Sequence, residues 1–157
     1  MQPLAQQSDR TFNEPELPPN GRIIAIDPGT KRMGIAISDE SRVAIRTLPA
    51  VERHSWKKLL LAIKGITEEF DAKALVIGLP LNTDESESEM SENARDLARK
   101  FSLSLEIPVF LQDERVTSYE ARRRLWERGV KPADTIKYVD SEAAAVILSD
   151  FLDRQHR

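Results

Sequence analysis

The chain of 157 residues is long enough for one domain with its own core, and too short for two large ones. It contains no cysteine and only two histidines, which excludes thiol catalysis, disulfides and thiolate metal sites and disfavours a histidine-based zinc site. The net charge is −3, and no apolar run approaches the roughly 20 residues of a membrane span, so no membrane partner is expected.

The first half of the chain predicts a tail, three strands and a helix. Residues 1–20 are rich in Gln, Pro, Asn and Glu without a period, and we interpret them as a disordered tail before a single domain at 21–157. Three short apolar runs joined by turns predict an antiparallel meander: Arg22–Asp27, Met33–Ser38 and Val43–Val51. Apolar residues at helical spacing then predict a helix from Ser55, its candidate N-cap, to Phe70.

The second half alternates between strands and helices. The predicted elements are a strand at Leu75–Leu79, a helix at Ser88–Leu103, a strand at Pro108–Leu111, a helix at Thr117–Arg128 and a helix at Val139–Leu152. Antiparallel hairpins followed by β-α-β units predict an α/β fold, in which a mixed five-stranded sheet carries helices on both faces.

Acidic residues stand at two predicted strand ends. Asp27 directly follows the apolar run of the first strand, and Asp113 with Glu114 follows the last one. The carboxyl ends of strands are where open α/β sheets bind ligands. The alternatives are a Pro-Gly turn at Asp27 and a polar strand end or helix cap at Asp113–Glu114. Neighbours on a strand face opposite ways, so only one of that pair is expected at a shared site.

Asp140 heads the apolar stripe of the last predicted helix. It is spaced i, i+3, i+4, i+7 and i+11 with Ala143, Ala144, Ile147 and Phe151. Burial of an unpaired carboxylate there would cost several kcal/mol, and a metal ion would offset that cost. The alternative is that Asp140 is simply the N-cap of this helix.

These acids can converge on one edge of the sheet. Oxygen ligands alone suit Mg²⁺ or Mn²⁺, and two such ions about 4 Å apart can activate a water and stabilise the leaving oxygen of a phosphodiester. The charge distribution allows a nucleic-acid partner: residues 1–20 carry −2 and Asp84–Glu92 carry −5, which leaves +4 on the remainder. The basic clusters Lys31–Arg32, Lys57–Lys58 and Arg122–Arg124 either contact phosphates or form a solvated face.

Four segments together resemble the YqgF-type family of pre-16S rRNA nucleases and Holliday-junction-resolvase-like proteins. They are, in chain order, Ile23–Asp39, Leu75–Asn82, Asp113–Ser118 and Val139–Leu148. The resemblance covers about residues 22–153. It implies an RNase H-like fold and a metal-dependent endonuclease that processes the 5′ end of the small-subunit rRNA precursor in the cytoplasm.

The resemblance also implies roles for individual residues. Asp27, Glu114 and Asp140 match the acidic positions of the family and are expected to be catalytic. The expected ligands of two Mg²⁺ or Mn²⁺ ions are these three acids together with Asp113, which stands beside Glu114. Residues expected to contact the nucleic-acid backbone are Thr30, Lys31, Arg32, Arg115 and Arg122. The chain departs from the family after Asn82, where Asp84-Glu85-Ser86 stands in place of an Asp-Gly-Thr segment.

Several functions remain open at this point. The substrate is expected to be structured RNA such as pre-16S rRNA, with a DNA junction as the alternative. A non-catalytic module that binds RNA or ribosome precursors on the same fold is a second hypothesis. The third is an actin-like phosphotransferase, suggested by Asp-Pro-Gly-Thr before a second strand; the chain is short for the two domains that such enzymes need.

Overall fold

The protein is described by a computed structural model that covers residues 14–156 except 30, 83, 85 and 115–131, with residues 132–140 described as backbone only. Five strands form one sheet in the order β3-β2-β1-β4-β5. Their bounds are β1 Ile23–Pro28, β2 Arg32–Ser38, β3 Ile45–Glu52, β4 Ala74–Pro80 and β5 Val109–Glu114. Strands β1, β2 and β3 pair antiparallel, whereas β1, β4 and β5 pair parallel, which confirms the mixed sheet.

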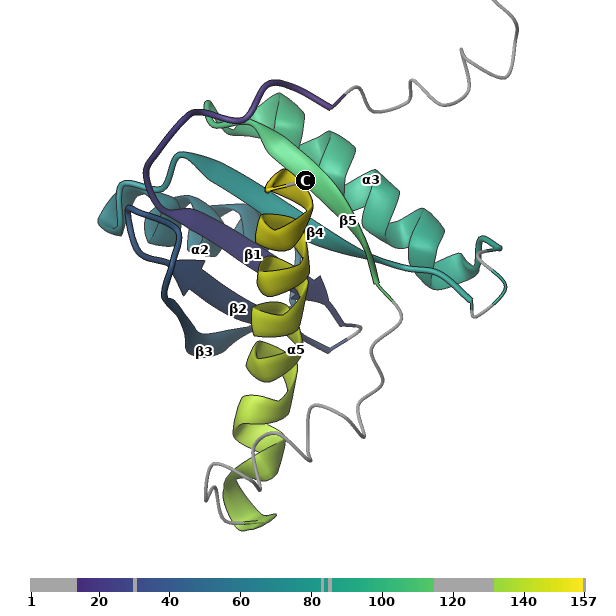
Figure 1. The fold of residues 1–157 in the computed structure, drawn as a ribbon. Coiled ribbons are helices and arrows are strands. Elements are labelled where there is room, and N and C mark those ends of the chain that lie inside the picture. Colours follow the sequence, from purple (N-terminus) through teal and green to yellow (C-terminus); the bar gives the residue numbers. More distant parts are fainter. Residues whose placement is uncertain (1–13, 30, 83, 85, 115–131, 157) are drawn as a thin grey trace, which may run out of the picture.

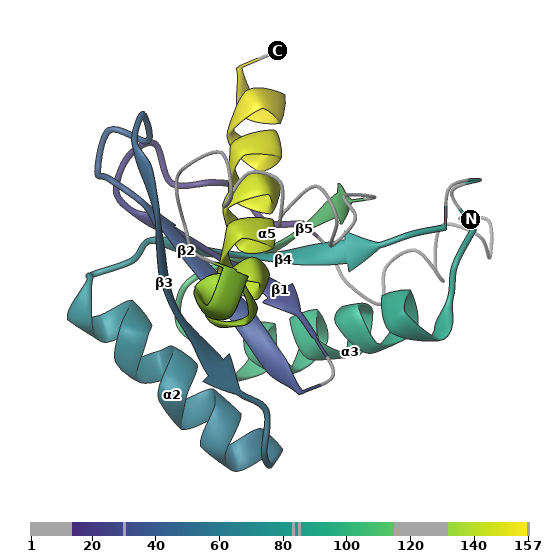
Figure 2. The ribbon, with the colours of Figure 1, turned by 90° about the horizontal axis from the view of Figure 1, so that it is seen from below.

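Helices cover both faces of this sheet. Helices α2 (Trp56–Glu69) and α3 (Glu89–Ser104) lie on one face, and α5 (Pro132–Gln155) crosses the other (Figures 1 and 2). Ser55 caps α2 by accepting a hydrogen bond from the Lys58 amide, as predicted. No helix in the part of the chain that the structure describes is long and apolar enough to cross a membrane.

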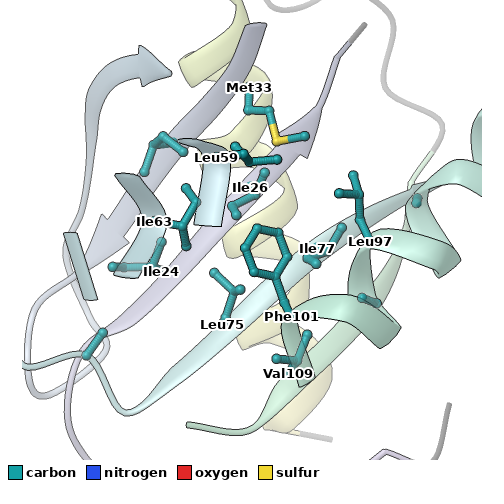
Figure 3. Packing of buried hydrophobic residues seen from close by; sticks show 14 of the residues in the cluster. Ile24, Ile26, Met33, Leu59, Ile63, Leu75, Ile77, Leu97, Phe101 and Val109 are labelled. Carbon is teal, nitrogen blue, oxygen red and sulfur yellow. The ribbon is translucent and has the colours of Figure 1, made fainter. Parts of the chain in front are cut away.

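Alternation along β1 divides the core into two layers. Ile24 and Ile26 are fully buried against α2 and α3, around Phe101 (Figure 3). Ile23 and Ala25 are fully buried against α5, in a cluster that contains Phe110 and Phe151. Burial of each such large side chain contributes about 1.5–3 kcal/mol to folding. Because side chains of a strand alternate between its two faces, Asp27 must lie on the same face as Ile23 and Ala25.

The last helix begins earlier than the sequence indicated. It starts at Pro132 rather than near Val139, because proline suits the first helical position, where its missing amide hydrogen costs nothing. The expectation that Asp140 could be an N-cap is therefore wrong, since Asp140 is eight residues inside the helix. The helix predicted at Thr117–Arg128 lies outside the described residues.

Two other boundaries differ from the predictions. Strand β5 continues through Asp113 and Glu114, so both acids belong to the strand rather than following it. Residues 14–20, which the sequence assigned to the tail, pack on the domain although they form no helix or strand. Leu17 contacts the α5-side core, and Glu14 forms an ion pair with Arg154 at 3.2 Å.

Candidate metal site at the carboxyl edge of the sheet

Asp27 lies at the carboxyl end of β1 on the face covered by α5. It follows the alternation of Ile23 and Ala25, which pack on that face, and it pairs with Gly34 of β2. The side chain is half-buried. A carboxylate in such a place needs compensating charge or hydrogen bonds, because partial loss of solvent disfavours its ionised form.

The turn after Asp27 is held by backbone contacts and by one arginine. The Gly29 amide donates to the Asp27 carbonyl at 2.9 Å, and a Cβ on Gly29 would lie 2.2 Å from the Arg32 carbonyl oxygen. Arg53 Nη1 donates to the Gly29 carbonyl at 3.0 Å, and the Arg53 amide donates to the Lys31 carbonyl at 2.8 Å. The Gly29–Asp27 contact closes a tight turn around Pro28, and a site at the Asp27 carboxylate is compatible with it.

The two acids of β5 face opposite sides of the sheet. Asp113 pairs with Leu79, which packs in the core layer of α2 and α3, and it lines a surface hollow with Arg95 of α3. Glu114 pairs with Pro80 and shares the alternation of Phe110, which packs against α5. One carboxylate oxygen of Glu114 is shielded from solvent. The structure therefore brings Glu114, and not Asp113, to the face that carries Asp27.

The register places Asp27 and Glu114 near the same end of the sheet, with β4 between their strands. Ile26 pairs with Ile77, and Gly78 pairs with Gln112, so Asp27 is level with Gln112 and Glu114 is two residues further on. Adjacent strands are roughly 4.8 Å apart, which separates the backbones of β1 and β5 by about 10 Å. Two carboxylate side chains can bridge that span through a pair of ions about 4 Å apart.

Helix α5 brings Asp140 to this face. Asp140 is i−4 from Ala144 and i−7 from Ile147, both of which are buried against the sheet. Its neighbour Ser141 is hydrogen-bonded to Ile35 of β2, one residue along the strand from Gly34, the pairing partner of Asp27. The stripe predicted from the sequence is therefore the sheet-facing one at Ala144, Ile147 and Phe151.

The donor chemistry at this edge fits a hard cation. Asp27 and Glu114 supply carboxylate oxygens, whereas the exposed His54 contacts Glu52 of the edge strand β3, with 3.0 Å between Nε2 and a carboxylate oxygen. Among the described side chains no three acidic or histidine residues are grouped closely enough to hold a metal. A three-acid site at this edge therefore requires Asp140, whose side chain lies outside the described set.

Basic side chains lie on one flank of the acids. Lys31 is exposed in the β1–β2 turn and Arg32 is half-buried at the start of β2, whereas Thr30, Arg115 and Arg122 lie outside the described residues. Lys57 and Lys58 are exposed in the first turn of α2, which begins directly after β3 at the same end of the sheet.

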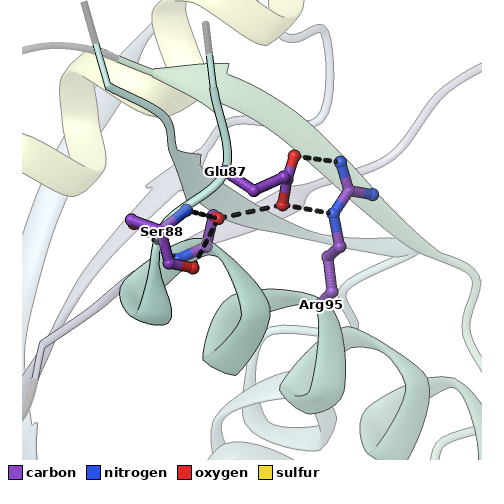
Figure 4. A network of polar contacts seen from close by, with 4 residues as sticks. Glu87, Ser88 and Arg95 are labelled. Atoms are coloured by element: carbon purple, nitrogen blue, oxygen red, sulfur yellow. Dashed lines mark hydrogen bonds and ion pairs between the residues drawn. The ribbon is translucent and has the colours of Figure 1, made fainter.

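The opposite flank is acidic and well ordered by hydrogen bonds. Glu87 accepts from Arg95 Nε and Nη2, both at 3.0 Å, and from Ser91 Oγ at 2.9 Å (Figure 4). The hydrogen bond from Arg95 is the main cause that lowers the pKa of Glu87. Ser88 and Ser91 form a capping box at the start of α3. The negative charges of Glu89 and Glu92 in the first turn interact favourably with the positive end of the helix dipole. The acidic run thus stabilises a helix N-terminus.

Sequence reasoning missed three residues near this edge. Arg53 closes the turn after Asp27, and Ser141 and Glu142 are polar residues of α5 that are only 0% and 5% exposed. No pattern marks them, because Ser141 and Glu142 sit beside the apolar stripe and Arg53 stands in a polar segment after β3. Arg53 and Ser141 are recognised only by their contacts with distant elements.

Comparison with known proteins gives one family. The model of the RuvX family, described as Holliday junction resolvase, matches residues 21–154. A protein of Anaeromyxobacter dehalogenans (strain 2CP-C) named "Putative pre-16S rRNA nuclease" is 40% identical over 134 residues, which cover 85% of this chain and 98% of that protein. A protein of the same name from Koribacter versatilis (strain Ellin345) is 35% identical over 87% of this chain and 89% of its own length.

Solved structures agree on the fold. Thermus thermophilus RuvC in complex with a Holliday junction substrate superposes with a TM-score of 0.52 at 12% identity, over 86% of this chain and 96% of that one. A second structure of Thermus thermophilus RuvC gives a TM-score of 0.50 at 14% identity, over the same shares of the two chains. The fold is therefore the RNase H-like α/β fold of the RuvC-type resolvases, as the sequence resemblance implied.

Proposed function

The chain belongs to the RuvX family of Holliday junction resolvases, and from this premise we propose that it is a metal-dependent endonuclease that trims the 5′ end of pre-16S rRNA in the cytoplasm. It is a hydrolase of phosphodiester bonds. Relatives that match it over nearly their whole length carry the name of a pre-16S rRNA nuclease, which favours the RNA precursor, and with it immature ribosomal particles, as the partner.

One observation supports catalysis at the carboxyl edge more than any other. Asp27 and Glu114 come from strands at different places in the sequence, yet strand alternation and register put both on the α5 face at one edge. Helix α5 presents its Asp140 position over the same face. Three carboxylates at one site suit Mg²⁺ or Mn²⁺. The sequence offers no other recognisable set of catalytic residues.

Asp27, Glu114 and Asp140 would hold the metal ions. Bound there, a pair of ions supplies an activated water and a counter-charge for the leaving oxygen. The residues of the chain itself position the substrate. Arg53 holds the turn that follows Asp27, and the exposed Lys31 in that turn would contact a backbone phosphate of the substrate.

The charges on the two sides of the acids indicate on which side the nucleic acid binds. Lys31, Lys57 and Lys58 lie on the side of β3 and α2, whereas the acidic start of α3 lies on the side of β4 and β5. A polyanion is attracted to the first flank and repelled from the second. We therefore place the bound nucleic acid across the β1–β2 turn and the first turn of α2, away from the acidic run.

A second candidate substrate is a four-way DNA junction. It is supported by the description of the family and by the fold shared with a resolvase bound to such a junction. The chain has one sheet within its described residues, and the family assignment supports hydrolysis of nucleic acid rather than phosphotransfer from ATP.

The test compares a pre-16S rRNA 5′ fragment with a four-way DNA junction as substrates, each with Mg²⁺, Mn²⁺ or EDTA. Asp27→Asn, Glu114→Gln and Asp140→Asn should each lower kcat by at least about 100-fold, which corresponds to about 2.7 kcal/mol of transition-state stabilisation. Asp113→Asn is the matched control on the same strand and should retain activity. Wild-type rates in folded Asp27→Asn, or binding without cleavage under any metal, would refute the nuclease.

A further inference from the structure

Strands β2 and β3 are interrupted by a bulge next to the candidate site. Met33 pairs with Val51 and Ile35 pairs with Leu48, so Gly34 alone faces the two residues Pro49 and Ala50. Proline has no amide hydrogen to give to a neighbouring strand. The ladder between β2 and β3 is therefore broken at the level of Gly34, which is the pairing partner of Asp27 on the other side of β2.

The hydroxyl of Ser141 fills this break from α5. The Ile35 amide donates to Ser141 Oγ at 3.3 Å, and Ser141 Oγ donates to the Leu48 carbonyl at 2.6 Å. Ser141 is fully buried, so water does not compete for either group. One side chain thus bridges two backbone groups that the bulge separates, and both lie more than 90 positions away in the sequence.

This bridge fixes the helix in a way that apolar packing does not. Ala144, Ile147 and Phe151 hold α5 on the sheet by non-directional contacts, which tolerate small rotations and slides. Two hydrogen bonds from a single oxygen define one position and one rotation of the helix at Ser141. At the other end of α5, Arg154 Nη2 donates to the Leu111 carbonyl of β5 at 3.1 Å, so polar contacts pin the helix to both edges of the sheet.

We propose that Ser141 is a positioning residue, which sets the place of Asp140 relative to Asp27 by locking α5 into the β2–β3 bulge. The inference rests on the proposed function of these two acids. Asp140 directly precedes Ser141, and the anchor point Ile35 is one residue from Gly34, which pairs with Asp27. Metal ligands must be held to within a fraction of an ångström, and loss of residues that orient them typically lowers metal affinity or activity 10–100-fold.

The test uses Ser141→Ala, which removes only the bridging oxygen. Mn²⁺ affinity, measured by calorimetry on the full chain, should fall about 10–100-fold, and kcat should fall by a similar factor with little change in KM. Amide hydrogen exchange at Ile35 should speed up in the same variant, because its acceptor is gone. Thr67→Ala is the matched control: Thr67 is a buried hydroxyl on α2, across the sheet, that donates to the Lys64 carbonyl at 2.8 Å.

The outcomes separate this inference from the proposed function. Wild-type Mn²⁺ affinity and kcat in folded Ser141→Ala, or equal losses in Thr67→Ala, would overturn the positioning role. If Ser141→Ala does not fold, Ser141→Cys, which keeps a weaker donor and acceptor, should show intermediate losses, and unchanged values in it would likewise overturn the inference. If the wild-type chain cleaves no substrate, the proposed function fails, while Mn²⁺ affinity still decides whether Ser141 positions a metal site.

Discussion

Ile147 of α5 packs directly over Gly78 of β4, and replacement of this glycine by alanine should push the helix away. A Cβ at this position would lie 2.4 Å from Ile147 Cδ1 and 3.1 Å from Ile147 Cγ1, both well inside normal contact. Ile147 is buried in the α5-side core, so its side chain has little room to move. Overpacking of this kind costs about 1–3 kcal/mol. Alanine also restricts the unfolded chain, which offsets about 0.4–1 kcal/mol.

We therefore expect Gly78→Ala to lower the free energy of unfolding by about 1–2 kcal/mol in urea denaturation. Ile147→Val removes Cδ1, the atom in closest conflict, and alone should cost about 0.5–1.5 kcal/mol. The double variant should be no less stable than Gly78→Ala, because the shortened side chain makes room for the new methyl group. Additive losses in this double-mutant cycle would show that the two residues do not meet and would refute the placement of α5.

Two further predictions concern the flanks of the site. Arg95→Gln should raise the pKa of Glu87 toward its ordinary value, which an NMR titration would measure. Because the pKa of Glu87 is lowered in the folded state, the ion pair stabilises the wild type at pH values above the unfolded-state pKa, and this contribution is lost as the pH falls through the folded-state pKa. An effect of the variant on stability that does not depend on pH would contradict the contact. The double variant Lys57→Gln with Lys58→Gln should bind RNA more weakly, and the slope of log affinity against log salt concentration should fall in magnitude by about 1.4–1.8. Lys73→Gln is the control and should leave this slope unchanged, because Lys73 pairs with Asp71 at the opposite end of β4.

Local patterns predicted much of this fold and the stripe of α5. Alternating and helical spacing located the strands and helices, Ser55 was recognised as a cap from its residue type, and Asp27 was placed at a strand end by the Pro-Gly turn after it. The alternation rule also predicted that Asp113 and Glu114 face opposite ways. It could not say which of them joins Asp27, because that depends on which core layer Phe110 enters.

Features that depend on how the strands and helices pair in space could not be predicted from the sequence. The bulge at Pro49 and Ala50 appears only when β2 and β3 are paired, and the bridge from Ser141 appears only when α5 is laid across them. Arg53 looks like an ordinary surface residue until its guanidinium is seen on the Gly29 carbonyl. The start of α5 was misplaced because a lysine-proline pair is equally typical of a loop and of a first helical turn.

A crystal structure of the full chain grown with Mn²⁺, with data collected at the manganese absorption edge, tests the central claim most directly. The account predicts anomalous peaks between β1 and β5 on the α5 face, with carboxylate oxygens of Asp27, Glu114 and Asp140 as ligands and none from Asp113. Manganese bound elsewhere while Asp27 and Glu114 share no ion would contradict it.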